Sequence, residues 1–155
     1  MTFRIGIISD THGLLRPEAE LRLAEVNHII HAGDIGSPDV IAALQQIAPV
    51  TAIRGNVDTA GWASTYADTV LVRLAGRKFY VLHDLKTLQV SPVALGIDMV
   101  VSGHSHVPKL KTVDGVLYLN PGSAGHRRFK LPITLATVDI TPDGLQPAIR
   151  DLSSG

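Results

Sequence analysis

Five short apolar runs of this chain each lead into side chains that bind divalent metal ions well. The runs are residues 3–9, 28–33, 50–55, 79–82 and 99–103. The side chains that follow them are Asp10, His12, Asp34, Asn56, His83, His104 and His106. Buried strands have this length and composition, and the ends of strands in α/β proteins are where active-site groups gather. The pattern therefore predicts a single metal cleft.

The spacing of these residues suits the hydrolysis of a phosphate ester. Asp10 and His12 are two residues apart, so they project to one side of extended backbone, and two later histidines repeat that spacing. Asp34 and Asn56 each follow a glycine, which permits a sharp turn. Two ions about 3.5–4 Å apart, with an anionic ligand between them, bind a phosphate and lower the pKa of a bridging water. The chain contains a donor set suited to that chemistry.

Taken singly, most of these residues also fit an ordinary structural role. Asp34 and Asn56 fit turns, because Gly-Asp and Gly-Asn are common there. His83 alone fits a hydrogen-bonded core histidine as well as a ligand. His104 and His106 are harder to explain by packing.

Composition limits the function further. The chain has 155 residues, which we expect to form one domain over 1–155, and it is 45% hydrophobic, 18% charged and formally neutral. Neutrality argues against extended nucleic acid or an acidic membrane surface as a partner. The absence of cysteine excludes thiolate sites, so His, Asp and Asn must hold any metal, a mixture suited to Mn, Fe, Zn, Ni or Co. The chain opens directly into a strand and has no apolar run near the roughly 18 residues of a membrane helix, so we expect a cytoplasmic location.

The elements that must position these residues alternate in the first half and are mostly strands in the second. We predict helices from Pro17 to about residue 26, from Pro38 to about residue 48, and from about residue 88 to 95. Turns at 75–77, 114–115 and 142–144 predict three hairpins, of which Asp114-Gly115 is the strongest. The fold class expected is an α/β sandwich of two mixed sheets with helices on the outer faces.

The ordered set of motifs resembles the calcineurin-like metallophosphoesterases, in particular their small bacterial and archaeal phosphodiesterases. The motifs are Asp10-x-His12, Gly33-Asp34, Gly55-Asn56-x-Asp58, His83 and Gly103-His104-x-His106, followed by residues 120–123. The resemblance covers about residues 3–140 and implies two divalent ions, with Mn expected and Fe, Zn, Ni or Co as alternatives. It also implies in-line attack on phosphorus by a hydroxide between the metals.

The resemblance also implies the role of each residue. One ion would be held by Asp10, His12, Asp34 and His106. The other would be held by Asp34, Asn56, His83 and His104. Asp34 would then bridge the ions. Asp34, Asn56 and His104 would act in catalysis, and Asn56 would also contact the substrate.

Two positions depart from the pattern of many relatives. Val57 occupies the position where these relatives carry a histidine that contacts phosphate and protonates the leaving group. Val57 can do neither, which suggests a diester with a good leaving group, or an acid from elsewhere. Asp84 follows His83 where small residues are common, and we expect it to support a ligand histidine.

Several other polar and aromatic residues leave alternatives open. Arg127 and Arg128 either bind the substrate phosphate as forks of N–H donors or belong to a solvated loop. We expect Asp58 and His31 to support the fold or the neighbouring ligands rather than bind metal. Trp62 and Tyr66 either pack or cover a substrate or an oligomer contact, and packing is the simpler interpretation.

The function predicted is a metal-dependent phosphodiesterase acting on a small phosphoester. A phosphomonoesterase acting on a nucleotide or small phosphorylated metabolite is the first alternative. A binding scaffold with a vestigial site is the second, although every ligand position holds a competent residue. A homo-oligomer is compatible with each of them.

Overall fold

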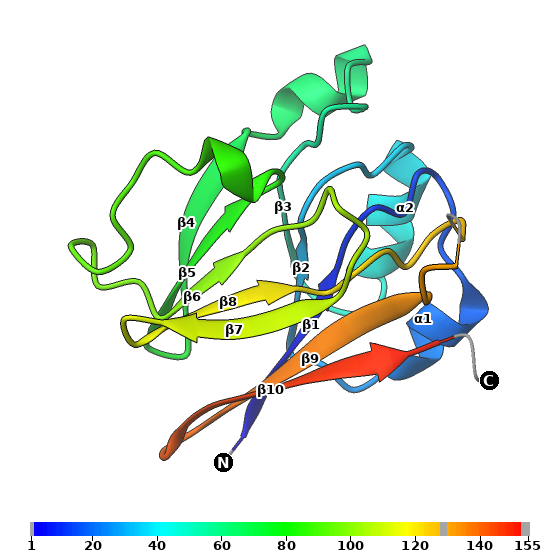
Figure 1. Ribbon diagram of the computed structural model, residues 1–155. Coiled ribbons are helices and arrows are strands. Elements are labelled where there is room, and N and C mark those ends of the chain that lie inside the picture. The colour runs from blue at the N-terminus through cyan, green and yellow to red at the C-terminus, as the bar shows by residue number, and fades with distance from the viewer. Residues whose placement is uncertain (1, 128–129, 153–155) are drawn as a thin grey trace.

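Two five-stranded sheets pack face to face in the computed structural model, which describes residues 2–127 and 130–152 (Figure 1). The first sheet has the order β10-β9-β1-β2-β3. Its strands are β1 (Phe3–Ile8), β2 (His28–His31), β3 (Val50–Ala52), β9 (Thr134–Thr141) and β10 (Gly144–Asp151). Strands β1, β2 and β3 are parallel, whereas β9 and β10 are antiparallel to their neighbours.

The second sheet has the order β4-β5-β6-β8-β7. Its strands are β4 (Thr69–Leu74), β5 (Arg77–Leu82), β6 (Met99–Val101), β7 (Lys109–Val113) and β8 (Val116–Asn120). The three inner strands β5, β6 and β8 are parallel, and the edge strands β4 and β7 run antiparallel to them. The predicted sandwich of two mixed sheets is confirmed.

The apolar pattern of the central strands explains the layers. Ile5 and Ile7 of β1 point into the space between the sheets, where they pack with Phe79 and Val101 of the second sheet. Ile8 points the other way, into a second cluster that lies beneath the helices. Because both faces of β1 are covered, nearly every residue of this strand is apolar, as in parallel sheets generally.

The helices α1 (Pro17–Arg22) and α2 (Pro38–Gln45) cover the outer face of the first sheet (Figure 1). Helix α2 begins as predicted, with the Ser37 hydroxyl accepting from the Asp39 amide and with Pro38 in the first turn. Both helices end some residues earlier than predicted. None of the helices in the described part of the chain has the length and apolar character needed to span a bilayer.

The helix predicted over 88–95 is wrong. The segment forms a single turn at residues 92–96, after the short 3₁₀ helix η2 (Leu85–Thr87). Another short 3₁₀ helix, η1 (Gly61–Thr65), lies between β3 and β4. Pro92 has no backbone N–H and disfavours helical geometry at Ser91, so the apolar spacing cannot be realised as a helix there. Leu88 and Val90 instead pack on the outer face of the second sheet.

The three predicted hairpins are confirmed, and the turns of two of them have the same tight backbone. Ala75 and Gly76 between β4 and β5 have φ of 49° and 82°, and Asp114 and Gly115 between β7 and β8 have 51° and 79°. Two successive residues with positive φ define the turn that matches the twist of a tight hairpin. Because β1, β2 and β3 in the first sheet and β5, β6 and β8 in the second are parallel, their carboxyl ends lie together at one edge of each sheet, where the loops of the predicted cleft lie.

Candidate metal centre

The backbone at the candidate metal ligands is unusual. Five residues other than glycine have left-handed backbone at this edge, with φ between 48° and 71°: Asp10, His12, Asp34, His104 and His106. Such a conformation costs about 1–2 kcal/mol for an L-residue, and it persists only where the surroundings hold it. Backbone hydrogen bonds between neighbouring loops hold it here, from Asp10 N to the Gly33 carbonyl (3.0 Å) and from His12 N to the Asp34 carbonyl (2.9 Å). The strain therefore coincides with the predicted ligand positions.

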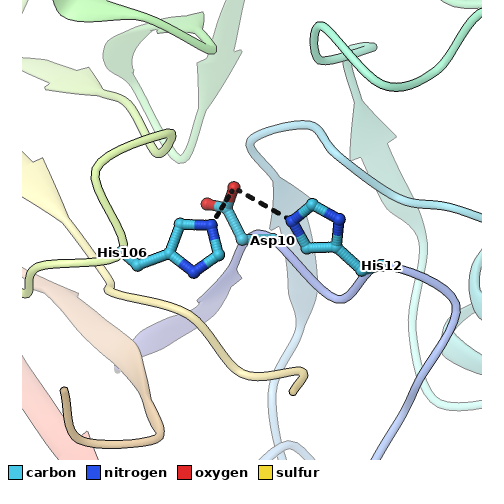
Figure 2. A group of neighbouring side chains, drawn as sticks. All are labelled: Asp10, His12 and His106. Carbon is cyan, nitrogen blue, oxygen red and sulfur yellow. Dashed lines mark ion pairs between the residues drawn. The ribbon is translucent and has the colours of Figure 1, made fainter. Parts of the chain in front are cut away.

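A first group of donors consists of Asp10, His12 and His106, whose ligand atoms lie within 4.8 Å of one another (Figure 2). Asp10 Oδ1 is 3.4 Å from His106 Nε2 and 3.8 Å from His12 Nε2. Asp10 comes from the end of β1 and His106 from the loop after β6, so the two sheets each supply part of the group. One oxygen and two ring nitrogens thus converge on a common space.

The Asp10 carboxylate is held by only one of its oxygens. Its Oδ2 accepts from the Ser9 hydroxyl (2.7 Å) and from the His104 amide (3.1 Å). Its Oδ1 is buried, and no hydrogen-bond donor in the described part of the chain reaches it. Burial raises the pKa of Asp10 to about 6, against the lowering effect of His83 and Ser9. Asp10 Oδ1 is thus a buried oxygen that faces imidazole nitrogens and, among the described residues, has no hydrogen-bond donor. Such an oxygen is suited to bind a cation, which would take the place of the missing donor.

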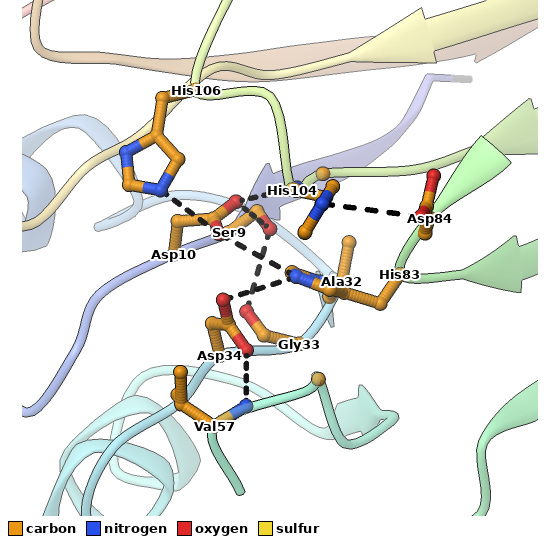
Figure 3. A network of polar contacts seen from close by, with 12 residues as sticks. Ser9, Asp10, Ala32, Gly33, Asp34, Val57, His83, Asp84, His104 and His106 are labelled. Atoms are coloured by element: carbon orange, nitrogen blue, oxygen red, sulfur yellow. Dashed lines mark hydrogen bonds and ion pairs between the residues drawn. The ribbon is translucent and has the colours of Figure 1, made fainter. Parts of the chain in front are cut away.

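A second group consists of Asp34, His83 and His104, again with ligand atoms within 4.8 Å (Figure 3). Asp34 Oδ1 accepts from the Val57 amide at 3.1 Å. Asp34 Oδ2 is 3.1 Å from His83 Nε2 and 3.6 Å from His12 Nε2, so it faces a histidine of each group. Burial tends to raise the pKa of Asp34, but contacts with His83, Val57 and His12 outweigh it and lower the value to about 2. Asp34 is consequently an anion at neutral pH.

The orientation of His83 also suits a metal ligand. Its Nδ1 is 2.7 Å from the Ala32 carbonyl and must carry a proton to donate to it, so Nε2 is left to face Asp34. Histidines that ligate metals commonly donate their other nitrogen to a backbone carbonyl or carboxylate in this way.

Asn56 completes the second group. Its amide oxygen faces acceptor atoms, at 3.3 Å from Asp34 Oδ1, 3.2 Å from His83 Nε2 and 3.3 Å from His104 Nδ1. Without a cation the amide would gain hydrogen bonds by turning its nitrogen toward these atoms. With a cation the oxygen would be the better atom at this position, because it offers lone pairs to a metal whereas the NH₂ group offers only donors. The donor set therefore fits divalent metal on both sides of Asp34.

Glycines let the ligand loops approach this closely. A Cβ at Gly55 would overlap the Asp34 carboxylate and backbone, and one at Gly33 would lie 2.7 Å from His83 Nδ1. Gly33 also has a φ of 99°, which favours glycine. The Gly-Asp and Gly-Asn motifs are thus explained by close packing of two loops as well as by a turn.

Asp58 ties these loops together. Its buried carboxylate accepts from the backbone amides of Ile35 (3.0 Å), Gly36 (2.9 Å) and Gly55 (2.8 Å). Asp58 thereby joins the loop that carries Asp34 to the loop that carries Asn56.

His31 lies fully buried behind the donors. Its Nδ1 accepts from the Gly33 amide (3.1 Å), so its Nε2 carries the proton and donates to the Thr11 hydroxyl (3.0 Å). That hydroxyl in turn donates to the Ile35 carbonyl (2.9 Å). The contacts of Thr11 with His31 and of Ser9 with Asp10 were not predicted. The one indication of them in the sequence is that both residues are direct neighbours of Asp10.

The remaining predicted residues are placed less centrally. Asp84 Oδ2 is 3.9 Å from His104 Nε2, close to a ligand candidate as expected. Arg127 is exposed and donates from Nε to the Leu131 carbonyl (3.2 Å), and Arg128 lies outside the described residues. The packing interpretation of Trp62 and Tyr66 is confirmed, since their rings meet edge to face at 6.3 Å and lie against the cluster under the helices.

Comparisons with known proteins identify the family. The model of the calcineurin-like phosphoesterase superfamily domain matches residues 3–143. A protein of Methanothermobacter thermautotrophicus named as a probable metallophosphoesterase is 35% identical over 130 residues, which are 77% of this chain and 76% of that protein. A phosphodiesterase of Methanocaldococcus jannaschii is 31% identical over 137 residues, 77% of this chain and 82% of that one. The chain belongs to the calcineurin-like phosphoesterase superfamily, as the motifs predicted.

Solved structures agree with this assignment. An archaeal phosphodiesterase superposes with a TM-score of 0.73 at 27% identity, over 96% of this chain and 100% of that one. Vacuolar protein sorting 29 of Cryptosporidium parvum superposes with a TM-score of 0.77 at 18% identity, over 97% of both chains, and shows the shared fold. The protein is thus a member of a metal-dependent phosphoesterase family with two groups of candidate metal ligands at its strand ends.

Proposed function

We propose that the protein is a phosphodiesterase with two divalent ions, held by the seven residues predicted from the sequence. The observation that carries the proposal is the position of Asp34 Oδ2, 3.6 Å from His12 Nε2 and 3.1 Å from His83 Nε2. An oxygen that faces one histidine of each donor group is placed to bridge two ions. Asp10, His12 and His106 would complete one ion's ligands, and Asn56, His83 and His104 those of the other.

The ions would supply Lewis-acid stabilisation of the phosphate charge and activation of water at neutral pH. The protein's own groups orient and hold this arrangement. Asp34 stays ionised because its neighbours keep its pKa low. Asn56 brings an uncharged oxygen to the centre, and the exposed ring of His104 lies where its Nε2 can also face a substrate. We propose Mn as the metal, with Fe, Zn, Ni and Co as alternatives to be tested.

Diesters are favoured over monoesters because the position after Asn56 carries no acid. The Val57 amide donates to Asp34 Oδ1, so Val57 lies at the candidate site, and its side chain, 46% exposed, has no proton to give a leaving group. A substrate with a good leaving group needs little such help. Arg127 is the candidate for contacting a phosphate oxygen, since its guanidinium is exposed on the loop that follows Ser123.

Hydrolysis of bis(p-nitrophenyl) phosphate by metal-stripped protein, with and without added Mn, tests the proposal beside p-nitrophenyl phosphate. We expect metal-dependent turnover that prefers the diester. Asp34→Asn should lower kcat/KM by about 10³-fold, since the ions contribute several kcal/mol to transition-state stabilisation. Asp39→Asn, an exposed carboxylate on α2, is the matched control and should retain activity.

The other outcomes separate the alternatives. Preference for the monoester would replace the diesterase proposal with a phosphomonoesterase, and would make Arg127 the first residue to substitute as the group that assists it. Absence of turnover with Mn, Ni, Co and Zn would contradict an enzymatic role and favour a binding scaffold on the same fold.

A further inference from the structure

A cavity of about 760 Å³ extends from the metal centre along the outer face of the second sheet. Its inner end is formed by Gly103 and His104, and its walls by β7, β8 and the segment around η2. Small-molecule sites span about 300–1,000 Å³, so the space is large for a phosphate group alone. It is large enough for one of the two groups esterified to the scissile phosphate, here called the substrate arm, when that phosphate lies at His104.

Three lysines line this cavity. Lys109 and Lys111 are two residues apart on β7 and so share one face of the sheet, and Lys111 is opposite Tyr118 in the pairing with β8. Lys86 reaches the cavity from η2, on a separate segment. Within the described residues none of these ammonium groups has an ion-pair partner, and all three lysines are exposed. Asp84 is the single carboxylate in the lining.

Lysines on an edge strand also have a simpler purpose, which is to prevent the edge from pairing with another chain. β7 is such an edge strand, and that purpose accounts for Lys109 and Lys111 taken alone. It does not account for Lys86, which lies outside the sheet yet faces the same cavity. It also leaves unexplained why Leu85 and Tyr118 form an apolar wall beside the charges.

We propose that this cavity, which we call the lysine groove, binds a substrate arm that carries a second phosphate or equivalent anion. The apolar wall at Leu85 and Tyr118 receives the body of the arm, and Lys86, Lys109 and Lys111 receive its charge. The proposal rests on the phosphodiesterase function inferred above and narrows its substrate class to diesters with an additional anionic group, such as a phosphorylated nucleoside.

Binding and turnover are measured separately, so that the two proposals can fail independently. Calorimetric titration of the Mn-loaded protein with thymidine 3′,5′-bisphosphate and with thymidine 5′-monophosphate reports the groove without any catalysis. Hydrolysis of thymidine 5′-(p-nitrophenyl phosphate), with and without a 3′-phosphate, reports turnover of matched diesters. The variants are Lys109→Gln with Lys111→Gln, and the control is Arg73→Gln, an exposed cation on the opposite edge strand of the same sheet.

We expect wild-type protein to prefer the 3′-phosphorylated ligand by about tenfold, mostly through Kd and KM, since two or three partly exposed charge pairs contribute modestly each. The double lysine variant should lose most of that preference and keep kcat/KM for bis(p-nitrophenyl) phosphate within about twofold. The control should behave as wild type. Equal binding of the two nucleotides by wild type, or an unchanged preference in the lysine variant, would overturn the lysine groove. If the bisphosphate binds more tightly than the monophosphate, this preference depends on the lysines, and no diester is hydrolysed, the lysine groove is supported and the phosphodiesterase proposal is overturned.

Discussion

Removing the Asp58 carboxylate should destabilise the protein and loosen the metal centre, although Asp58 is itself no candidate ligand. The carboxylate is 3% exposed and accepts three backbone N–H groups, from Ile35, Gly36 and Gly55. Oδ2 takes two of these bonds and Oδ1 the third. The two loops that it joins carry Asp34 and Asn56, so both donors depend on it for their separation.

The expected magnitude follows from these bonds. Hydrogen bonds to a charged group contribute about 1.5–3 kcal/mol each. Asp58→Asn retains one oxygen for Ile35 and Gly55, the partners of Oδ2, and turns an NH₂ toward the Gly36 amide, so it should cost about 2 kcal/mol. Asp58→Ala loses both acceptor oxygens and all three hydrogen bonds, and partial entry of water limits its cost to about 4 kcal/mol. In a domain of this size that corresponds to a fall in Tm of about 8–16 °C.

Urea unfolding of the metal-stripped variants measures the free energy of unfolding, and calorimetric titration with Mn measures the metal affinity. We expect affinity in Asp58→Asn to fall by about 10–100-fold, as when other groups that orient ligands are removed. Asp39→Asn is the control and should change the unfolding free energy by less than about 1 kcal/mol. If Asp58→Ala unfolds within 1 kcal/mol of wild type, other contacts hold the two loops and the reasoning from the three amides is refuted.

Two further predictions concern Val57 and His31. Val57→His should raise kcat/KM for diesters with alkyl leaving groups about tenfold, because a general acid helps poor leaving groups most. The kcat/KM for nitrophenyl diesters should change little. An equal change for both kinds of substrate, or the same gain in Val57→Gln, would contradict this prediction. Burial holds the pKa of His31 at about 3, although the charges of Asp58 and Asp34 raise it, so the unfolded chain takes up a proton below about pH 6.5 that the folded protein does not. Stability contributed by the neutral ring is therefore complete above pH 6.5 and falls by up to about 1.4 kcal/mol per pH unit as the pH decreases toward 3. His31→Asn keeps an acceptor for the Gly33 amide but cannot titrate, so the stability advantage of wild type over this variant should shrink by about 2–3 kcal/mol between pH 7 and 4.5 in metal-free urea unfolding. A constant difference would show that His31 takes up its proton equally in the folded and unfolded states, which would contradict the lowered pKa.

Much of the fold was predictable because its determinants are local. Continuous apolar runs identified the buried strands, and Asp114-Gly115 predicted a hairpin turn because both residues adopt positive φ readily. The helix predicted over 88–95 failed for a reason also present in the sequence, since Pro92 interrupts the segment.

The candidate site was predictable to the level of residue type and order. Metal-binding side chains after successive strands indicate one cleft, because parallel strands bring their carboxyl ends to the same edge. The ordered motifs also identified the family, which the match over residues 3–143 confirmed. The assignment of each residue to an ion remains a proposal.

Tertiary structure alone decided which atoms meet. The left-handed backbone at Asp10 and Asp34 is imposed by hydrogen bonds between loops more than 20 residues apart, and no local pattern encodes it. A supporting role was predicted for Asp58, but its three backbone partners are known only once the loop after β2 is placed against it. The lysine groove likewise exists only because η2 and β7, which are more than 20 residues apart in the chain, line the same cavity. Side-chain type and periodicity are properties of short segments, so the chemical groups and the strands that carry them could be predicted from the amino-acid sequence. Distances, the protonated nitrogen of each histidine and the shape of the cavity depend on how the two sheets pack, which is a property of the whole chain.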